Sequence, residues 1–84
     1  MWFKPKAFKV KLTGRAGLIY QEGGKTMNID SEMLAGPDSD MVIYLDSISK
    51  WNPPHENELI SVERKEQIKA NLLKELSNIR IEWQ

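Results

Sequence analysis

Apolar and polar residues alternate over residues 8–13, which read FKVKLT. A period of two residues is typical of a strand that is buried on one face only. Two further short apolar segments, residues 18–20 and 26–29, predict a second and a third strand. Between them lies Gly23-Gly24, where positive φ angles cost little, so the two strands are expected to form a tight hairpin.

The second half of the chain contains two more strand-like patterns. Residues 41–45 (MVIYL) form the most apolar run and predict a central strand covered on both faces. Residues 79–83 (IRIEW) alternate again and predict a last strand. Residues 31–34 fit either a brief strand or a single helical turn, and the pattern leaves both open.

One long helix is expected over residues 62–77. Ser61 is a suitable N-cap, Glu63 suits the positive end of the helix dipole, and Asn78 could end the helix in a left-handed conformation. An apolar stripe at helical spacing consists of Ile68, Leu72, Leu73 and Leu76. The predicted fold is therefore α+β, an antiparallel sheet of four to five strands with one amphipathic helix packed on one face and the last strand after the helix.

Length and composition limit the possibilities further. A chain of 84 residues predicts a single domain over residues 1–84, with residues 1–6 as a loose N-terminal arm. It contains no cysteine, which excludes disulfides, thiolate metal sites and cysteine nucleophiles. No apolar run approaches the roughly 20 residues of a membrane span. We therefore expect a soluble, cytoplasmic protein without a membrane partner.

The formal net charge of zero conceals a segregation along the chain. Residues 1–21 carry five bases and no acid, whereas residues 22–63 carry nine acids and two bases. Residues 64–84 carry five bases and three acids. Two interpretations stay open: the segments pair with one another in the fold, or they form separate charged surfaces that serve as binding faces.

Candidate catalytic chemistry is sparse. His55 is the only histidine, and a metal site would have to combine it with Glu56 and Glu58. A serine nucleophile would lack the Gly-x-Ser-x-Gly elbow, and residues 14–17 lack the spacing of a phosphate-binding loop. We predict no catalytic, cofactor-binding or metal-binding residues, and a small enzyme that uses His55 is the least favoured alternative.

The connector of residues 46–56 (DSISKWNPPHE) stands out because it combines a tryptophan, two prolines and the only histidine. Two consecutive prolines fix two φ angles, and the first disfavours a helical conformation at Asn52. The connector is thus expected to be stiff. Trp51 is either a lid folded over one end of the core or the aromatic anchor of a binding surface, and the frequent burial of tryptophan favours the lid.

The same sequence, extended to residues 46–61 (DSISKWNPPHENELIS), resembles that of a family of small bacterial immunity proteins. It is the immunity protein 74 family, whose members are found beside polymorphic-toxin genes. The Glu/Lys-rich helix with Ile68 and the Ile-Arg-Ile-Glu-Trp end continue the resemblance, which runs from about Gly14 to Trp83. Membership would imply that the protein neutralises a cognate toxin by binding it stoichiometrically.

An acidic surface would suit such a partner, because a toxin that is a nuclease has a basic cleft that carboxylates can occupy. The hypothesis for the binding residues combines the acids around the central strand and the connector: Asp38, Asp40, Asp46, Trp51, His55, Glu56 and Glu58. The alternative function is a small regulatory module that binds nucleic acid through its basic residues 2–15. Zero net charge makes nucleic acid the less favoured partner. The oligomeric state, the toxin and its activity stay open.

Overall fold

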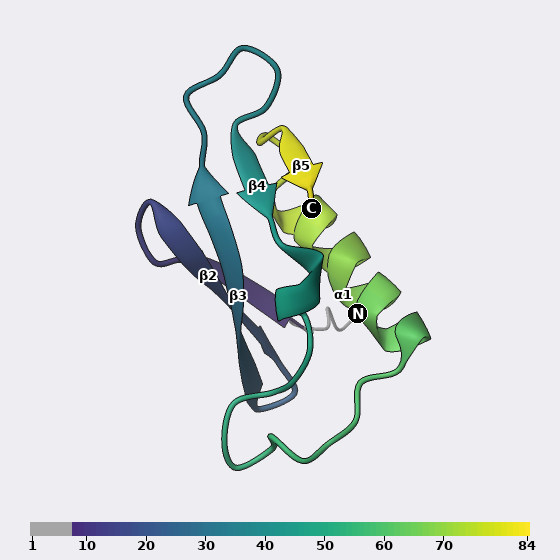
Figure 1. Ribbon diagram of the computed structural model, residues 1–84. Coiled ribbons are helices and arrows are strands. Elements are labelled where there is room, and N and C mark those ends of the chain that lie inside the picture. The colour runs from purple at the N-terminus through teal and green to yellow at the C-terminus, as the bar shows by residue number, and fades with distance from the viewer. Residues whose placement is uncertain (1–7) are drawn as a thin grey trace, which may run out of the picture.

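Five strands form one sheet, in which they lie side by side in chain order from β1 to β5. The structure is a computed structural model that describes residues 8–84. The strands are β1 (Phe8–Leu12), β2 (Ala16–Glu22), β3 (Lys25–Met33), β4 (Met41–Ile43) and β5 (Ile81–Trp83). Between β4 and β5 come a short 3-10 helix, η1 (Leu45–Ser47), and the α-helix α1 (Val62–Glu75). Because α1 lies against one side of the sheet and precedes the last strand (Figure 1), the predicted α+β fold is confirmed.

The strand pairing is antiparallel from β1 through β4, and β5 lies parallel to β4 at the edge. An antiparallel pair can be closed by a short turn, whereas a parallel pair needs a long crossover. That crossover is the segment of residues 44–80, which contains η1 and α1. The sheet is therefore mostly antiparallel, with one parallel pair that α1 makes possible.

Two strand boundaries differ from the expectation. Residues 31–33 continue β3, so the strand interpretation of this segment is the right one. β4 ends at Ile43, although residues 41–45 were expected to form one strand. The chain turns into η1, where Ser47 N–H bonds back to Tyr44 O at 3.1 Å and Ile48 N–H bonds back to Leu45 O at 3.0 Å.

The turn between β2 and β3 forms as predicted. Gly23 and Gly24 have φ angles of 57° and 79°, a backbone conformation that residues with a side chain rarely adopt. On either side of them, Glu22 of β2 pairs directly with Lys25 of β3. A two-residue turn with both φ angles positive matches the twist of the strands that it joins. It fixes the register of the hairpin and places Lys25 at the first position of β3.

The helix begins where the sequence predicted it. The hydroxyl Oγ of Ser61 accepts a hydrogen bond from Arg64 N at 3.1 Å, so Ser61 is the N-cap. Ile68, Leu72 and Leu76 of the predicted stripe are buried. Leu73 is 46% exposed and lies outside the stripe, because the adjacent Leu72 already occupies the inward position.

The end of the helix corrects one expectation. α1 ends at Glu75, and Leu76 follows with φ −106°. Asn78 does not adopt a left-handed conformation, since no non-glycine residue within 8–84 has a positive φ. Leu76 N–H still bonds to Leu72 O and Ile79 N–H bonds to Leu76 O, both at 2.9 Å. These bonds close the last turn without a left-handed residue.

The core fills the space between the sheet and α1. Its buried residues come from the inward side of β2 to β4, from α1 and the residue that follows it, and from the segment after η1. They are Leu18, Tyr20, Met27, Ile29, Met41, Ile43, Ile48, Trp51, Ile68, Leu72 and Leu76. Asn28, Asp30 and Glu32 alternate with the inward residues of β3, so they lie on the side of the sheet that α1 does not cover. Within residues 8–84, no helix has the length and apolar composition needed to cross a bilayer. The loose arm expected over residues 1–6 lies outside the described residues.

Candidate functional site

The loop of residues 48–61, here called the Pro-Pro loop, connects η1 to α1 and lies at one end of the sheet (Figure 1). It starts from two buried residues, Ile48 and Trp51. Near its other end, Ile60 is partly buried and packs against the core. The peptide bond between Pro53 and Pro54 is cis. The loop is therefore attached to the core at both ends, with its middle directed toward solvent.

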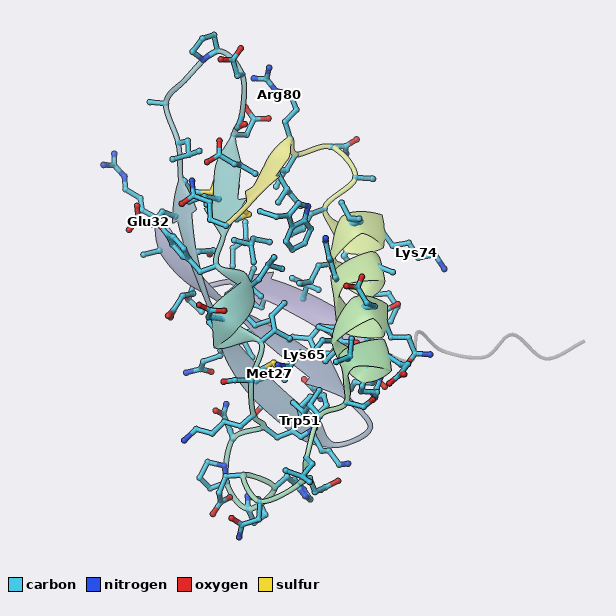
Figure 2. The ribbon with its side chains drawn as sticks, turned by 45° about the vertical axis from the view of Figure 1, so that its right-hand side comes forward. Met27, Glu32, Trp51, Lys65, Lys74 and Arg80 are labelled. Carbon is cyan, nitrogen blue, oxygen red and sulfur yellow. The ribbon has the colours of Figure 1, made fainter. Side chains whose placement is uncertain are left out.

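Trp51 is the base of the loop. Its side chain is only 4% exposed and lies at the end of the core that the loop covers (Figure 2). Its ring stacks on that of Tyr20 with centroids 6.2 Å apart, and Tyr20 stacks in turn on Phe8 at 6.1 Å. Lys25 Nζ lies 5.8 Å from the centroid of the Trp51 ring. The interpretation of Trp51 as a lid over the core is confirmed, and its ring offers a partner almost no surface.

Asn52 fastens the loop to β3. Its backbone N–H donates to Thr26 O at 2.7 Å. Its side-chain Nδ2 donates to Thr26 Oγ1 and to Asn28 Oδ1, both at 3.1 Å. Three hydrogen bonds from one residue to the neighbouring strand fix the direction in which the chain enters the two prolines.

Glu58 holds the far side of the loop. Its Oε1 lies 2.6 Å from Lys25 Nζ, and its Oε2 lies 2.9 Å from Nδ1 of His55. Hydrogen bonding from Lys25 holds the pKa of Glu58 below its usual value of 4.5. Glu58 N–H also bonds to His55 O at 3.1 Å. Of the predicted binding residues, His55 and Glu58 are thus brought into contact, and both take part in holding the loop.

The sequence interpretation missed the most exposed apolar residue of the described chain. Leu59 is 99% exposed, and Val62, the first residue of α1, is 74% exposed. A signal for this exposure exists in the sequence. Ser61 as N-cap fixes the start of the helix, and of the adjacent Leu59 and Ile60 only one can turn inward on an extended chain. Ile60 takes the inward position, which leaves Leu59 outside.

Asp38 and Asp40 lie at the opposite end of the molecule, in the loop between β3 and β4 (Figure 1). Asp40 forms an ion pair with Arg80, Oδ1 to Nη2 at 3.0 Å, and its Oδ2 accepts from the backbone N of Arg80 at 3.0 Å. Hydrogen bonds from Arg80 lower the pKa of Asp40 from its usual 3.8. Arg80 Nη1 also donates to Pro37 O at 2.6 Å. Asp40 therefore holds this loop against Arg80, the residue that precedes β5, while Asp38 is exposed.

The predicted binding residues do not form one continuous surface. Asp46 is exposed on η1, between the two end loops. Asp38 and Asp40 precede β4 and Asp46 follows it, as expected, but His55, Glu56 and Glu58 lie in the Pro-Pro loop. The acids are therefore divided between three places: the loop before β4, the 3-10 helix η1, and the Pro-Pro loop at the opposite end of the sheet.

The charged segments pair in part. Glu22 forms an ion pair with Arg64, and Asp40 forms one with Arg80, so acids of the middle segment meet bases of the last segment. The basic strand β1 lies beside β2 instead, where Lys9 faces Gln21. The pairing interpretation therefore holds for Arg64 and Arg80, and among the described residues it does not hold for the lysines of β1.

A polar cluster joins α1 to β2 beside the core. The hydroxyl of Tyr20 donates a hydrogen bond to the carboxylate of Glu22 and accepts one from Asn71 Nδ2 at 2.8 Å. Glu22 in turn forms an ion pair with Arg64. Burial, with a contribution from the hydrogen bond to Glu22, raises the pKa of Tyr20 to about 12. A phenol that stays neutral in this position serves to hold the helix on the sheet.

The side of the sheet away from α1 carries an open hollow. It has a volume of about 420 Å³ and is lined in part by Gly17, Asp30, Glu32 and Tyr44. Figure 2 shows Glu32 pointing away from α1. Among the residues that the structure describes, no three His, Asp or Glu side chains are grouped to hold a metal ion. Two exposed carboxylates, those of Asp30 and Glu32, therefore lie at this hollow.

These features define a class: a small α+β protein with a rigid, acid-bearing loop at one end. Residues 9–82 match the sequence model of the family described as immunity protein 74. The chain therefore belongs to the immunity protein 74 family. Membership makes a toxin protein the partner and suggests a non-catalytic role. No curated protein and no solved structure gives a significant match to the chain.

Proposed function

We propose that the protein neutralises one cognate toxin domain by direct, stoichiometric binding, that it performs no chemistry itself, and that it does so in the cytoplasm. The observation that carries this proposal is the family match, which covers residues 9–82. The architecture supports it. A binding protein needs a surface that is held in one conformation before its partner arrives, because ordering a flexible loop on binding costs affinity.

The Pro-Pro loop supplies such a surface. Trp51 attaches it to the core, Asn52 binds it to β3, and Glu58 is held by Lys25 and His55. Between these attachments lies Glu56, which is exposed. We therefore place the main toxin contact at this loop, with His55, Glu56 and Glu58 as its polar part and Trp51 as its support.

The remaining acids act at longer range in this proposal. Asp38 and Asp46 are exposed away from the loop, and Asp40 keeps its negative charge beside Arg80. Opposite charge on two partners raises the rate of encounter, and it does so over roughly 8–10 Å at physiological ionic strength. These acids would steer a basic toxin toward the protein without forming part of the tight contact.

The test is reconstitution with the C-terminal domain of the toxin encoded beside the gene for this protein. We expect a one-to-one complex in a calorimetric titration and loss of toxin activity at the same ratio. Inhibition that continues far below one equivalent would contradict stoichiometric binding and indicate catalysis. Absence of both complex and inhibition would remove the proposed function.

Two sets of charge variants then locate the binding face. Glu56→Gln should slow association and weaken its salt dependence, whereas Lys9→Gln with Lys11→Gln should not. The lysine variant is also the control for nucleic acid. Salt-dependent binding of the wild-type protein to plain DNA or RNA, abolished by the lysine changes, would favour the nucleic-acid module instead.

A further inference from the structure

Leu59 differs from every other exposed apolar residue of the described chain. At 99% exposed, its side chain has almost no contact with the protein, and Val62 is 74% exposed. The next most exposed large apolar residue is Leu73 at 46%, so it and the others keep more than half of their surface covered. A single exposed leucine is ordinary, whereas here two apolar residues three positions apart both keep most of their surface in solvent, which is how an apolar contact site for a partner looks before binding.

The residues on either side of Leu59 are fixed. Glu58 is bound to Lys25 and to His55. Ile60 packs against the core, and the hydroxyl of Ser61 caps α1. The backbone at Leu59 therefore has little freedom, although its side chain reaches solvent. An apolar side chain held in this way can enter a pocket with little loss of conformational entropy.

Carboxylates surround this position in the sequence. Glu56 precedes Leu59 and Glu63 follows Val62, and neither forms an ion pair with another residue of the range 8–84. A partner surface that covers the two apolar residues would have to face these negative charges. Charge complementarity therefore specifies the partner: an apolar pocket bordered by lysine or arginine side chains.

We infer that Leu59, with Val62 three positions further along the chain, is the apolar anchor by which the protein binds its toxin, and that it inserts into an apolar pocket with a basic rim. This inference rests on the proposed function and makes it specific. The hypothesis from the sequence combined Trp51 with the neighbouring acids as binding residues. The fold places Trp51 in the core and puts Leu59 in the exposed position among the acids instead.

The test compares Leu59→Ser, in the Pro-Pro loop, with Leu73→Ser, a matched change at an exposed leucine on α1. The probe is the purified toxin domain, and the dissociation constant and melting temperature of each variant are measured. Leu59→Ser should weaken binding about 10- to 100-fold, mainly through faster dissociation, because burial of a leucine side chain is lost. Its melting temperature should not change, and Leu59→Met should restore the affinity. Leu73→Ser should bind as the wild type does.

A second measurement does not depend on affinity. A photo-activated crosslinking residue in place of Leu59 should join the protein to the toxin, and the same residue in place of Leu73 should not. If the wild type binds the toxin while Leu59→Ser binds equally well and no crosslink forms, the inference is wrong and the proposed function stands. If the wild type binds no toxin, both fail.

Discussion

The rings of Tyr20 and Trp51 stack with their centroids 6.2 Å apart and their planes 29° from parallel. Tyr20 lies on β2 and Trp51 lies in the Pro-Pro loop, so this contact attaches the loop to β2. Both side chains are buried. The stability of the fold and the shape of the candidate binding loop therefore depend on the same pair of residues.

We expect Trp51→Ala to lower the free energy of unfolding by about 3–5 kcal/mol, as the loss of a large buried aromatic side chain does. Small domains have about 5–15 kcal/mol in total, so the variant should be largely unstable. Urea denaturation measures the change. Trp51→Phe should cost less because a ring remains to stack on Tyr20. A loss below about 1 kcal/mol for Trp51→Ala would show that the ring does not support the core.

The N-cap gives a second prediction. Ser61→Ala should reduce the free energy of unfolding by about 1 kcal/mol, because the N–H of Arg64 loses its hydrogen-bond acceptor. Ser61→Asn, which keeps an acceptor oxygen, should stay close to the wild type. Ser77→Ala, an exposed serine beyond the helix, is the matched control in the same denaturation series. Equal stability of Ser61→Ala and Ser77→Ala would contradict the assignment of the cap.

Tyr20 predicts how stability changes in alkali. Its pKa is raised from 10.0 to about 12 in the folded protein, so the unfolded chain loses this proton at lower pH. The stabilising effect is complete below pH 10.0 and is lost as the pH rises toward about 12. The near-ultraviolet absorbance of tyrosinate should report one phenol that resists ionisation until the protein unfolds.

Tyr20→Phe is the control for this effect. In this variant the absorbance titration should no longer contain a phenol that resists ionisation, and the free energy of unfolding should fall less steeply as the pH rises above 10.0. The substitution should also cost about 1–3 kcal/mol near neutral pH, because Asn71 and Glu22 lose a shared hydrogen-bond partner. An unchanged alkaline profile in this variant would show that another group causes the loss.

Two carboxylates predict the behaviour in acid. The pKa of Glu58 lies below 4.5 because Lys25 donates to it, and that of Asp40 lies below 3.8 because Arg80 does. Both groups therefore bind protons more readily in the unfolded chain. Their contribution is present above the unfolded values and is lost as the pH falls through the lower folded values.

Denaturant midpoints measured from neutral pH downward test this effect. Asp40→Asn and Glu58→Gln should each show a shallower loss of stability in acid than the wild type. Glu56→Gln is the matched control, since Glu56 is exposed and forms no ion pair within the described residues. If all three variants follow the wild-type profile, these ion pairs do not contribute to acid stability.

The local elements of this fold were accessible from the sequence because neighbouring residues decide them. Alternation over residues 8–13, the Gly23-Gly24 turn and the cap at Ser61 each depend on interactions within a few positions of the chain. At residues 31–34, the local pattern fitted a strand and a single helical turn equally well, so it did not distinguish between them. There, pairing of Ser31 with Ile43 in β4 selected the strand.

The residue types also singled out the Pro-Pro loop as unusual and indicated the family to which the chain belongs. They did not show which side chains of the loop face outward. Trp51 and Leu59 are both apolar residues of one connector, and only the position of Tyr20 beneath the loop turns the first inward and leaves the second in solvent. Such contacts join residues far apart in the chain, which no local pattern records.

The distribution of charge shows the same division. The order of the residues was enough to show how many acids surround the central strand and the loop, and that the helix would be amphipathic. Only the tertiary structure decided that Asp40 pairs with Arg80 and Glu58 with Lys25, and that the acids lie at opposite ends of the sheet. The physical reason is that an ion pair depends on a distance in space between residues far apart in the chain. The pairing of β4 with β5 brings Arg80 to Asp40, and the attachment of the Pro-Pro loop to β3 brings Glu58 to Lys25.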